Sequence, residues 1–210
     1  MDKLIGEELV ARRTVNVAVI IPDASPVLTL ARIGRLDLFE TFTAPIHIVD
    51  QVHYEITKED NDPKGEAKDW LRRMGNRVTI EETLVGVGFQ TKVERGETPR
   101  AANLGEIAVD EYATRLALGG APTFVPLVLF EDPDVLETRI ARLPRAHLLN
   151  TAAWIRALTE EGIIRDGPEL IDAINARRAS PLQPYERPGR TARLRSRWLS
   201  KRRTTDNDAG

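Results

Sequence analysis

Residues 17–26 read Val-Ala-Val-Ile-Ile-Pro-Asp-Ala-Ser-Pro, and this stretch decides the fold class. Its first five residues form an uninterrupted apolar run of strand length, which is typical of a central strand buried on both faces. Ser25 followed by Pro26 then predicts the start of a helix, with a capping hydroxyl and a proline at the first helical position. Asp23 lies between the two elements. Because Ser25 already supplies the cap, this acid has no simple structural role.

The rest of the chain repeats this alternation of strand and helix. Short apolar runs flanked by turn residues predict further strands at 46–49, 78–80, 124–130 and 148–149. Amphipathic patterns predict helices over ranges that include 27–33, 52–56, 67–74, 104–117, 151–158 and 170–174. We therefore expect an α/β protein with a mostly parallel central sheet between two helical layers, a three-layer α/β/α fold.

Two segments depart from the pattern. Residues 84–93 look extended, but Gly86 and Gly88 weaken a strand there, so we expect a hairpin or a flap at the sheet edge. After residue 180 apolar residues become rare and Arg and Pro dominate. We expect one domain over 1–180 and a flexible, Arg-rich tail over 181–210.

Size and composition exclude several classes of protein. The 210 residues suffice for one good core and not comfortably for two. There is no cysteine, which excludes disulfides, zinc–thiolate sites and thiol nucleophiles. The longest apolar run, 17–21, is far shorter than the roughly 20 residues that cross a bilayer, and the N-terminus has no secretory pattern. We expect a cytoplasmic protein without membrane contact.

Charge is distributed unevenly along the chain. The net charge is −2, yet residues 187–203 contain eight Arg or Lys and no acid, which leaves −10 for the remainder. An acidic body repels nucleic acid unless a bound cation or the basic tail offsets its charge.

Acidic residues lie where predicted strands end or helices begin. Asp23 and Asp132 follow strands, whereas Glu55 and Glu106 lie in the first turns of helices, with Asp110 one turn further along. Because ligands of parallel sheets bind outside the carboxyl ends of the strands, we expect these acids to converge. Clustered carboxylates need a cation, and a divalent ion held only by carboxylates usually handles phosphate.

Each acid also has a plain structural interpretation. The spacing around Glu55 alone is typical of a solvated helix residue. Glu106 and Asp110 share a helix face, where like charges repel by about 0.2–0.5 kcal/mol unless a cation lies between them. Three acids crowd the strand end at 131–134, and which of them, or Asp110, completes a site is left open by the sequence.

Taken in order, these motifs resemble the PIN-domain family. The matching features are an opening strand with Asp and Ser, a Val three residues before a Glu, a Gly-Glu helix start, a strand ending in paired acids, and a last helix with its turn. They occupy 19–28, 46–56, 104–108, 127–132, 148–155 and 162–164. The likeness covers about residues 15–178, and the Gly-Glu start is similar to one PIN subgroup. One departure is the last acidic motif, which reads Glu-Asp-Pro-Asp where the family usually has Asp-Asp or Asp-Asn with a nearby Arg or Lys.

The resemblance implies a metal-dependent endoribonuclease with Mg²⁺ or Mn²⁺ as cofactor. It implies that Asp23 anchors the metal, that Glu55, Glu106 and Asp132 complete the ligand set, and that Asp110 or Asp132 orients the attacking water. These five acids are therefore the expected catalytic residues.

The resemblance also implies partners. Many family members are the toxin of a VapC-type toxin–antitoxin pair, so RNA, an antitoxin protein and a second copy in a homodimer are expected. Ser25 would bind a metal ligand or the phosphate, and Arg193, Arg195 and Arg197 of the tail would contact the RNA backbone.

Two other function classes are compatible with the sequence. A PIN-like module without catalytic activity could bind nucleic acid or protein, and the altered last acidic motif favours this alternative. A small-molecule-binding α/β protein such as a phosphotransfer receiver ranks last, because the expected Lys at a late strand end is missing.

Overall fold

One sheet organises the chain. The computed structural model describes residues 17–97, 103–119, 125–143 and 145–187. Within these ranges the sheet has six strands in the order β3-β2-β1-β4-β5-β6; the first five are parallel and β6 is antiparallel to β5. The strands are β1 (Val17–Pro22), β2 (Ile46–Val49), β3 (Val78–Glu81), β4 (Val125–Phe130), β5 (His147–Asn150) and β6 (Glu186–Arg187). The predicted α/β class with a mostly parallel sheet is confirmed.

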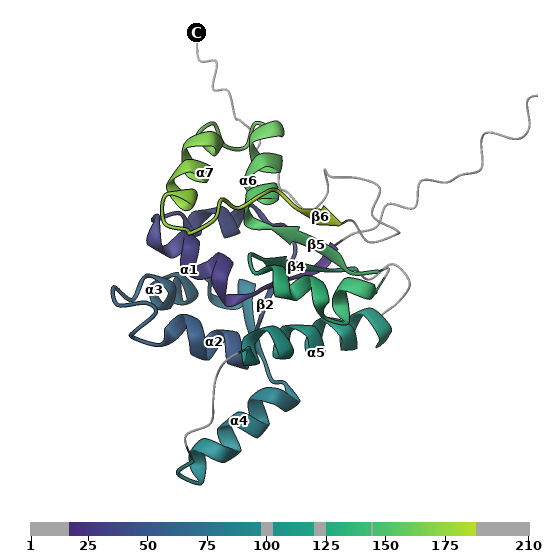
Figure 1. Ribbon diagram of the computed structural model, residues 1–210. Coiled ribbons are helices and arrows are strands. Elements are labelled where there is room, and N and C mark those ends of the chain that lie inside the picture. The colour runs from purple at the N-terminus through teal and green to yellow at the C-terminus, as the bar shows by residue number, and fades with distance from the viewer. Residues whose placement is uncertain (1–16, 98–102, 120–124, 144, 188–210) are drawn as a thin grey trace, which may run out of the picture.

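Helices cover both faces of this sheet, and Figure 1 shows α6 and α7 on one side and α5 on the other. The ring of Phe39 lies 4.8 Å from that of Trp70 and 5.2 Å from that of Trp154, which joins three elements on one face. None of the helices in the described ranges is long and apolar enough to cross a membrane. The helical elements are α1 (Ala24–Arg32), η1 (Leu36–Thr41), α2 (Asp50–Thr57), α3 (Glu66–Met74), η2 (Gly75–Arg77), α4 (Leu84–Glu94), α5 (Leu104–Gly119), η3 (Pro133–Glu137), η4 (Ile140–Arg142), α6 (Thr151–Glu160) and α7 (Gly167–Asn175).

The start of α1 differs from the prediction by two residues. Asp23, and not Ser25, occupies the N-cap position, and its carboxylate makes no capping hydrogen bond. Pro26 is the third helical residue and has no N–H, so one of the two amides that an N-cap side chain commonly binds is missing. Asp23 therefore stands at a helix start without serving as its usual cap.

The segment 84–93 is a helix, α4, so the prediction of an extended hairpin or flap there is wrong. Thr83 caps the helix by accepting a hydrogen bond from the Gly86 amide. The Thr83 amide and hydroxyl in turn donate to the carboxylate of Asp50, at 3.0 and 2.7 Å. The carboxylate of Glu111 accepts from the amides of Leu84 and Val85. Acids from α2 and α5 thus satisfy the first turn of a helix whose glycines disfavour it locally.

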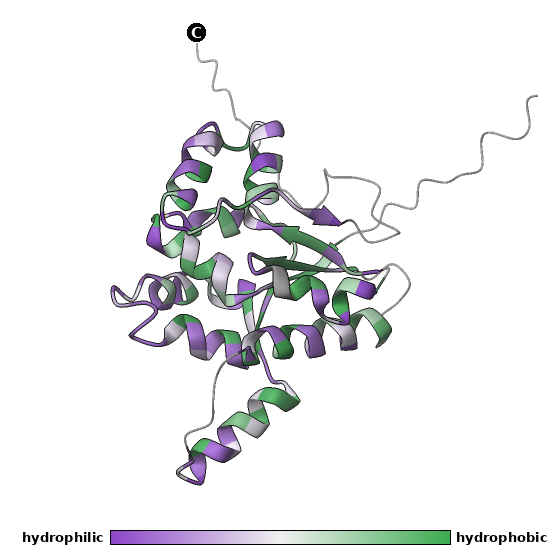
Figure 2. Ribbon diagram, viewed as in Figure 1, coloured by the Kyte–Doolittle hydropathy of each residue, from purple (hydrophilic) through white to green (hydrophobic). Residues whose placement is uncertain are grey.

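Helix α4 projects away from the rest of the molecule (Figure 1). Figure 2 shows hydrophobic residues in its first turns. Leu84 is 80% exposed and Val87 is 52% exposed, whereas Phe89 packs on Tyr54 with 5.3 Å between ring centroids. The helix is therefore fixed at one face and open at the other.

Residues 181–187, which the sequence assigned to the tail, pack against the body of the protein. Leu182 is buried in the core, and Tyr185 packs edge-on against Phe130 at 5.8 Å. The side chain of Asn150 donates to the carbonyl of Gln183 at 2.6 Å, and β6 pairs with β5. The Arg187 guanidinium donates to three backbone carbonyls, those of Ile140, Leu143 and Ala146. The predicted tail residues Arg193, Arg195 and Arg197 lie outside the described residues.

Candidate functional site

The order of the strands places a ligand-binding edge between β1 and β4. From β1 the chain continues to β2 on one side, and from β4 it continues to β5 on the other side. Such a switch point leaves a crevice at the carboxyl ends of the strands, where ligands of open α/β sheets bind. Asp23 directly follows β1, and its amide donates to the carbonyl of Leu129 in β4 at 2.8 Å. Glu131 and Asp132 directly follow β4.

Asp23 is a buried carboxyl group in an acidic environment. Its residue is only 2% exposed. Burial, followed by the negative charge of Glu106 and, more weakly, that of Glu55, raises the pKa of Asp23 to about 7, while the amides of Ala24 and Ser25 partly oppose this rise. The charges that raise the pKa of Asp23 therefore come from two other acids, Glu106 and Glu55.

Glu55 reaches the same region from α2. Burial and the charge of Glu106 raise the pKa of Glu55 to about 7, whereas a hydrogen bond from the Gly105 amide favours its ionised form. A Cβ atom at residue 105 would stand 2.9 Å from Oε1 of Glu55. The Glu55 carboxylate thus lies directly against the first turn of α5.

Glu106 follows Gly105 in that turn and acts on both other acids. Three of the residues selected from the sequence, Asp23, Glu55 and Glu106, therefore come from three separate elements and interact electrostatically. Their mutual repulsion makes the loss of a proton from Asp23 or Glu55 costly near neutral pH.

The three carboxylates do not form a ready-made coordination shell. Across the described residues, no group of three or more Asp, Glu or His side chains is arranged to hold a metal ion. The donors nevertheless suit a hard cation such as Mg²⁺ or Mn²⁺, because they are carboxylate oxygens and a bound cation would relieve their mutual repulsion.

Asp110 has a structural partner. Its Oδ1 accepts a hydrogen bond from the amide of Ile140 in η4, with 2.6 Å between the atoms. Asp110 is not among the groups that raise the pKa of Asp23 or Glu55. The structure thus gives Asp110 a hydrogen bond to the segment after β4, and its predicted catalytic role stays a prediction.

Glu131 is also committed elsewhere. Its Oε2 accepts hydrogen bonds from the hydroxyl of Thr29 at 3.0 Å and from Nη1 of Arg178 at 2.6 Å. Burial raises the pKa of Glu131, and the Thr151 hydroxyl, Thr29 and Arg178 partly offset that rise. Asp132 is the neighbouring acid; it is partly exposed and has interactions of its own. The side chain of Asp134 lies outside the described residues.

Ser25 lies in the first turn of α1, two residues after Asp23. Its backbone amide favours the ionised form of Asp23, and its side chain is half-buried. The structure therefore gives the backbone of Ser25 a contact at the acidic cluster and leaves the predicted role of its hydroxyl untested.

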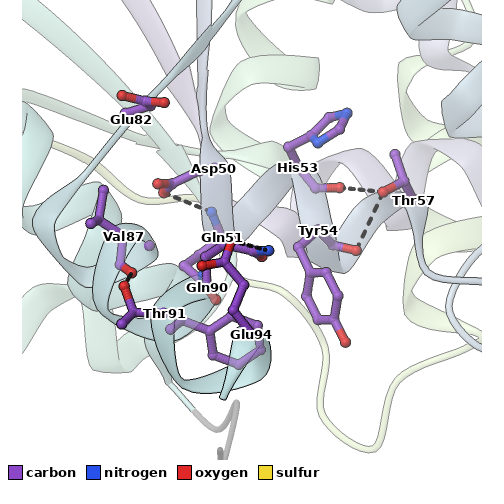
Figure 3. A pocket seen from close by; sticks show the side chains of 12 residues that line it. Asp50, Gln51, His53, Tyr54, Thr57, Glu82, Val87, Gln90, Thr91 and Glu94 are labelled. Carbon is purple, nitrogen blue, oxygen red and sulfur yellow. Dashed lines mark hydrogen bonds between the residues drawn. The ribbon is translucent and has the colours of Figure 1, made fainter. Parts of the chain in front are cut away.

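A groove of about 550 Å³ lies apart from this cluster, between α2 and α4 (Figure 3). It is lined on one side by His53, Tyr54 and Thr57, and on the other by Val87 and Phe89. Its other lining residues are Asp50, Gln51, Glu82, Gly86, Gln90, Thr91 and Glu94. Among the described residues the lining includes three acids and no Arg or Lys, which disfavours a phosphate backbone there.

Sequence reasoning missed two features, the groove between α2 and α4 and the contact of Arg178 with Glu131. The groove depends on α4, whose only local helix signal is the capping pattern of Thr83 before Leu84. Arg178 gave no signal, because one arginine in a polar stretch does not reveal a buried partner 47 residues away.

Comparisons with family models, with curated proteins and with solved structures found no match to this chain. Function is therefore inferred from the site itself.

Proposed function

We propose that this protein is a divalent-metal-dependent endoribonuclease of the PIN type, which hydrolyses phosphodiester bonds in RNA. The observation that carries the proposal is the cluster of Asp23, Glu55 and Glu106 beside the switch point of the sheet. A buried acid repelled by two further acids is costly to the metal-free fold, and bound Mg²⁺ or Mn²⁺ would relieve that cost.

Asp23 is the anchor in this proposal, because it is the most buried of the three acids and follows the central strand. Glu55 and Glu106 complete the ligand set from α2 and α5. Asp132, which directly follows β4, or Asp110, one turn after Glu106 in α5, would orient the attacking water. The bound cation would supply positive charge that offsets the phosphodiester and makes water more acidic.

RNA is the proposed substrate, an antitoxin the proposed protein partner and a homodimer the proposed assembly. Ser25, at the start of α1, would contact the phosphate. Arg193, Arg195 and Arg197 would supply the positive charge that the acidic body lacks. The acidic groove between α2 and α4 is not part of the proposed RNA path.

Cleavage of a mixed pool of single-stranded and structured RNA tests the proposal. Wild-type protein should cut RNA with Mg²⁺ or Mn²⁺ and stop when EDTA is added. Asp23→Asn should abolish cleavage, whereas Asp60→Asn, which changes an exposed acid paired with Lys58, should leave it intact. Cleavage that survives EDTA or Asp23→Asn would refute the metal mechanism.

A second candidate is a PIN-like module that binds RNA or protein without cutting. The engagement of Glu131 by Arg178 favours it, since one acid of the last motif is thereby removed from the site. Metal-independent RNA binding without any cleavage, across the same pool, would support this second candidate.

A further inference from the structure

Gly105 is a glycine for reasons of space. It lies in the first turn of α5 and is buried. It is not among the residues with positive φ, so its backbone does not require glycine. Glycine is less favourable than alanine in a helix, so some other constraint must explain it.

That constraint is the carboxylate of Glu55. A Cβ at residue 105 would lie 2.9 Å from Oε1 and 3.3 Å from both Cδ and Oε2 of Glu55. By contrast, a Cβ at Gly88 in α4 would meet no other atom within 4 Å. A side chain at 105 would therefore push Glu55 away from α5.

Because Gly105 has no side chain, the first turn of α5 can approach the Glu55 carboxylate closely and acts on it in two opposite ways. The Gly105 amide donates to its carboxylate, and the next residue, Glu106, repels that carboxylate. One turn of helix thus holds Glu55 in place and sets a second acid beside it.

We infer that Gly105 is a positioning residue of the proposed metal site, which holds the Glu55 carboxylate at the first turn of α5 so that Glu55 and Glu106 can face one cation. This inference rests on the proposed metal-dependent function. The competing explanation is that Glu55 serves only to satisfy an amide at the start of α5.

Calorimetric titration of the full chain with Mn²⁺ distinguishes the two, alongside melting temperatures without metal. Gly105→Ala should lower Mn²⁺ affinity by about 10- to 100-fold, the usual effect of losing a group that orients a metal ligand. The control Gly88→Ala makes the same change in a helix with open space, and it should leave Mn²⁺ affinity unchanged.

A second variant keeps the test decisive if Gly105→Ala does not fold. Glu55→Asp in the Gly105→Ala background shortens the acid by one methylene and makes room for the Cβ, so it should restore folding and measurable Mn²⁺ binding. Glu55→Asp alone should bind more weakly than wild type, because its carboxylate no longer reaches the Gly105 amide.

The outcomes separate this inference from the function proposal. Wild-type affinity for Mn²⁺ in Gly105→Ala would overturn the positioning role and leave the proposed function standing. Absence of Mn²⁺ binding by the wild-type chain would overturn the proposed function itself. A fall in melting temperature with unchanged Mn²⁺ affinity would show that Gly105 serves only the start of α5.

Discussion

Nη1 of Arg178 donates to Oε2 of Glu131 at 2.6 Å, and this ion pair joins the segment after α7 to the end of β4. The Glu131 side chain is 1% exposed, and the guanidinium offsets part of the solvation that burial removes. Thr29 of α1 contributes a second hydrogen bond to the same oxygen. The pair fixes the strand end immediately before Asp132.

Arg178→Met should destabilise the protein by about 3–5 kcal/mol, because it leaves a buried acid without its cation. Urea denaturation measures this loss. The neighbouring Arg177 is the matched control, since its guanidinium donates to the exposed carbonyl of Ala173 and forms no ion pair with an acid within the described residues. Arg177→Met should change stability by less than about 0.5 kcal/mol.

The same variant has a pH signature. Burial already raises the pKa of Glu131, and removal of Arg178 should raise it further. A protonated Glu131 tolerates burial, so the destabilisation should be larger at high pH than at low pH. An equal loss under both conditions would mean that Arg178 contributes packing and not charge.

Asp23 should make the stability of the metal-free protein fall as pH rises. Its pKa is about 7 in the fold against an ordinary value of 3.8, so the folded state holds the proton more tightly. This stabilisation is fully present below the ordinary pKa and is lost as pH rises through about 7. Asp23→Asn should therefore melt higher than wild type at pH 8 without metal, and the gain should shrink towards pH 5.

Mg²⁺ or Mn²⁺ at pH 8 should raise the wild-type melting temperature and leave that of Asp23→Asn unchanged. Asp60→Asn controls for loss of one surface charge and should respond to metal like wild type. A melting temperature of Asp23→Asn that tracks wild type at every pH would contradict repulsion at Asp23.

Two truncations should behave differently. Removal of 188–210 leaves every described contact intact, so the melting temperature should not change. Removal of 181–210 also deletes Leu182, Tyr185 and β6, and should cost at least about 2 kcal/mol, comparable to loss of one buried leucine.

The shorter truncation also tests the tail as an RNA contact. Each phosphate contact contributes close to one log unit of affinity per log unit of salt. Removal of Arg193, Arg195 and Arg197 with the tail should weaken RNA binding and flatten its salt dependence. Identical affinity and salt slope in the full and truncated chains would assign the tail to a protein partner.

Substitution of two glycines of α4 by alanine should change the stability of the protein in opposite directions. A Cβ on Gly86 would overlap the Asp50 carboxylate, whereas Gly88 has open space. Gly86→Ala should cost about 1–3 kcal/mol by forcing α4 from α2, and Gly88→Ala should gain up to about 1 kcal/mol. Urea denaturation gives both values, and hydrogen exchange of the α4 amides shows where the change occurs. Equal stability of the two variants would mean that Asp50 does not hold α4.

Local sequence patterns determined the central strands and the acids at their ends. The apolar run at 17–21 needs burial on both faces, and a chain that alternates such runs with amphipathic helices has few arrangements besides a parallel sheet. Asp23 could therefore be assigned to a strand end without coordinates. The order of strands and the interaction of Asp23 with Glu55 and Glu106 required the structure.

Tertiary structure decided the features that local patterns left open or predicted wrongly. Helix α4 forms against its glycines because Asp50 and Glu111, distant in sequence, satisfy its first turn. Asp110 and Glu131 are bound by partners 30 and 47 residues away in the sequence, which no local pattern reveals. The physical reason is common to all of them: periodicity reports which face of an element is buried, whereas long-range hydrogen bonds and desolvation decide which polar groups stay unpaired.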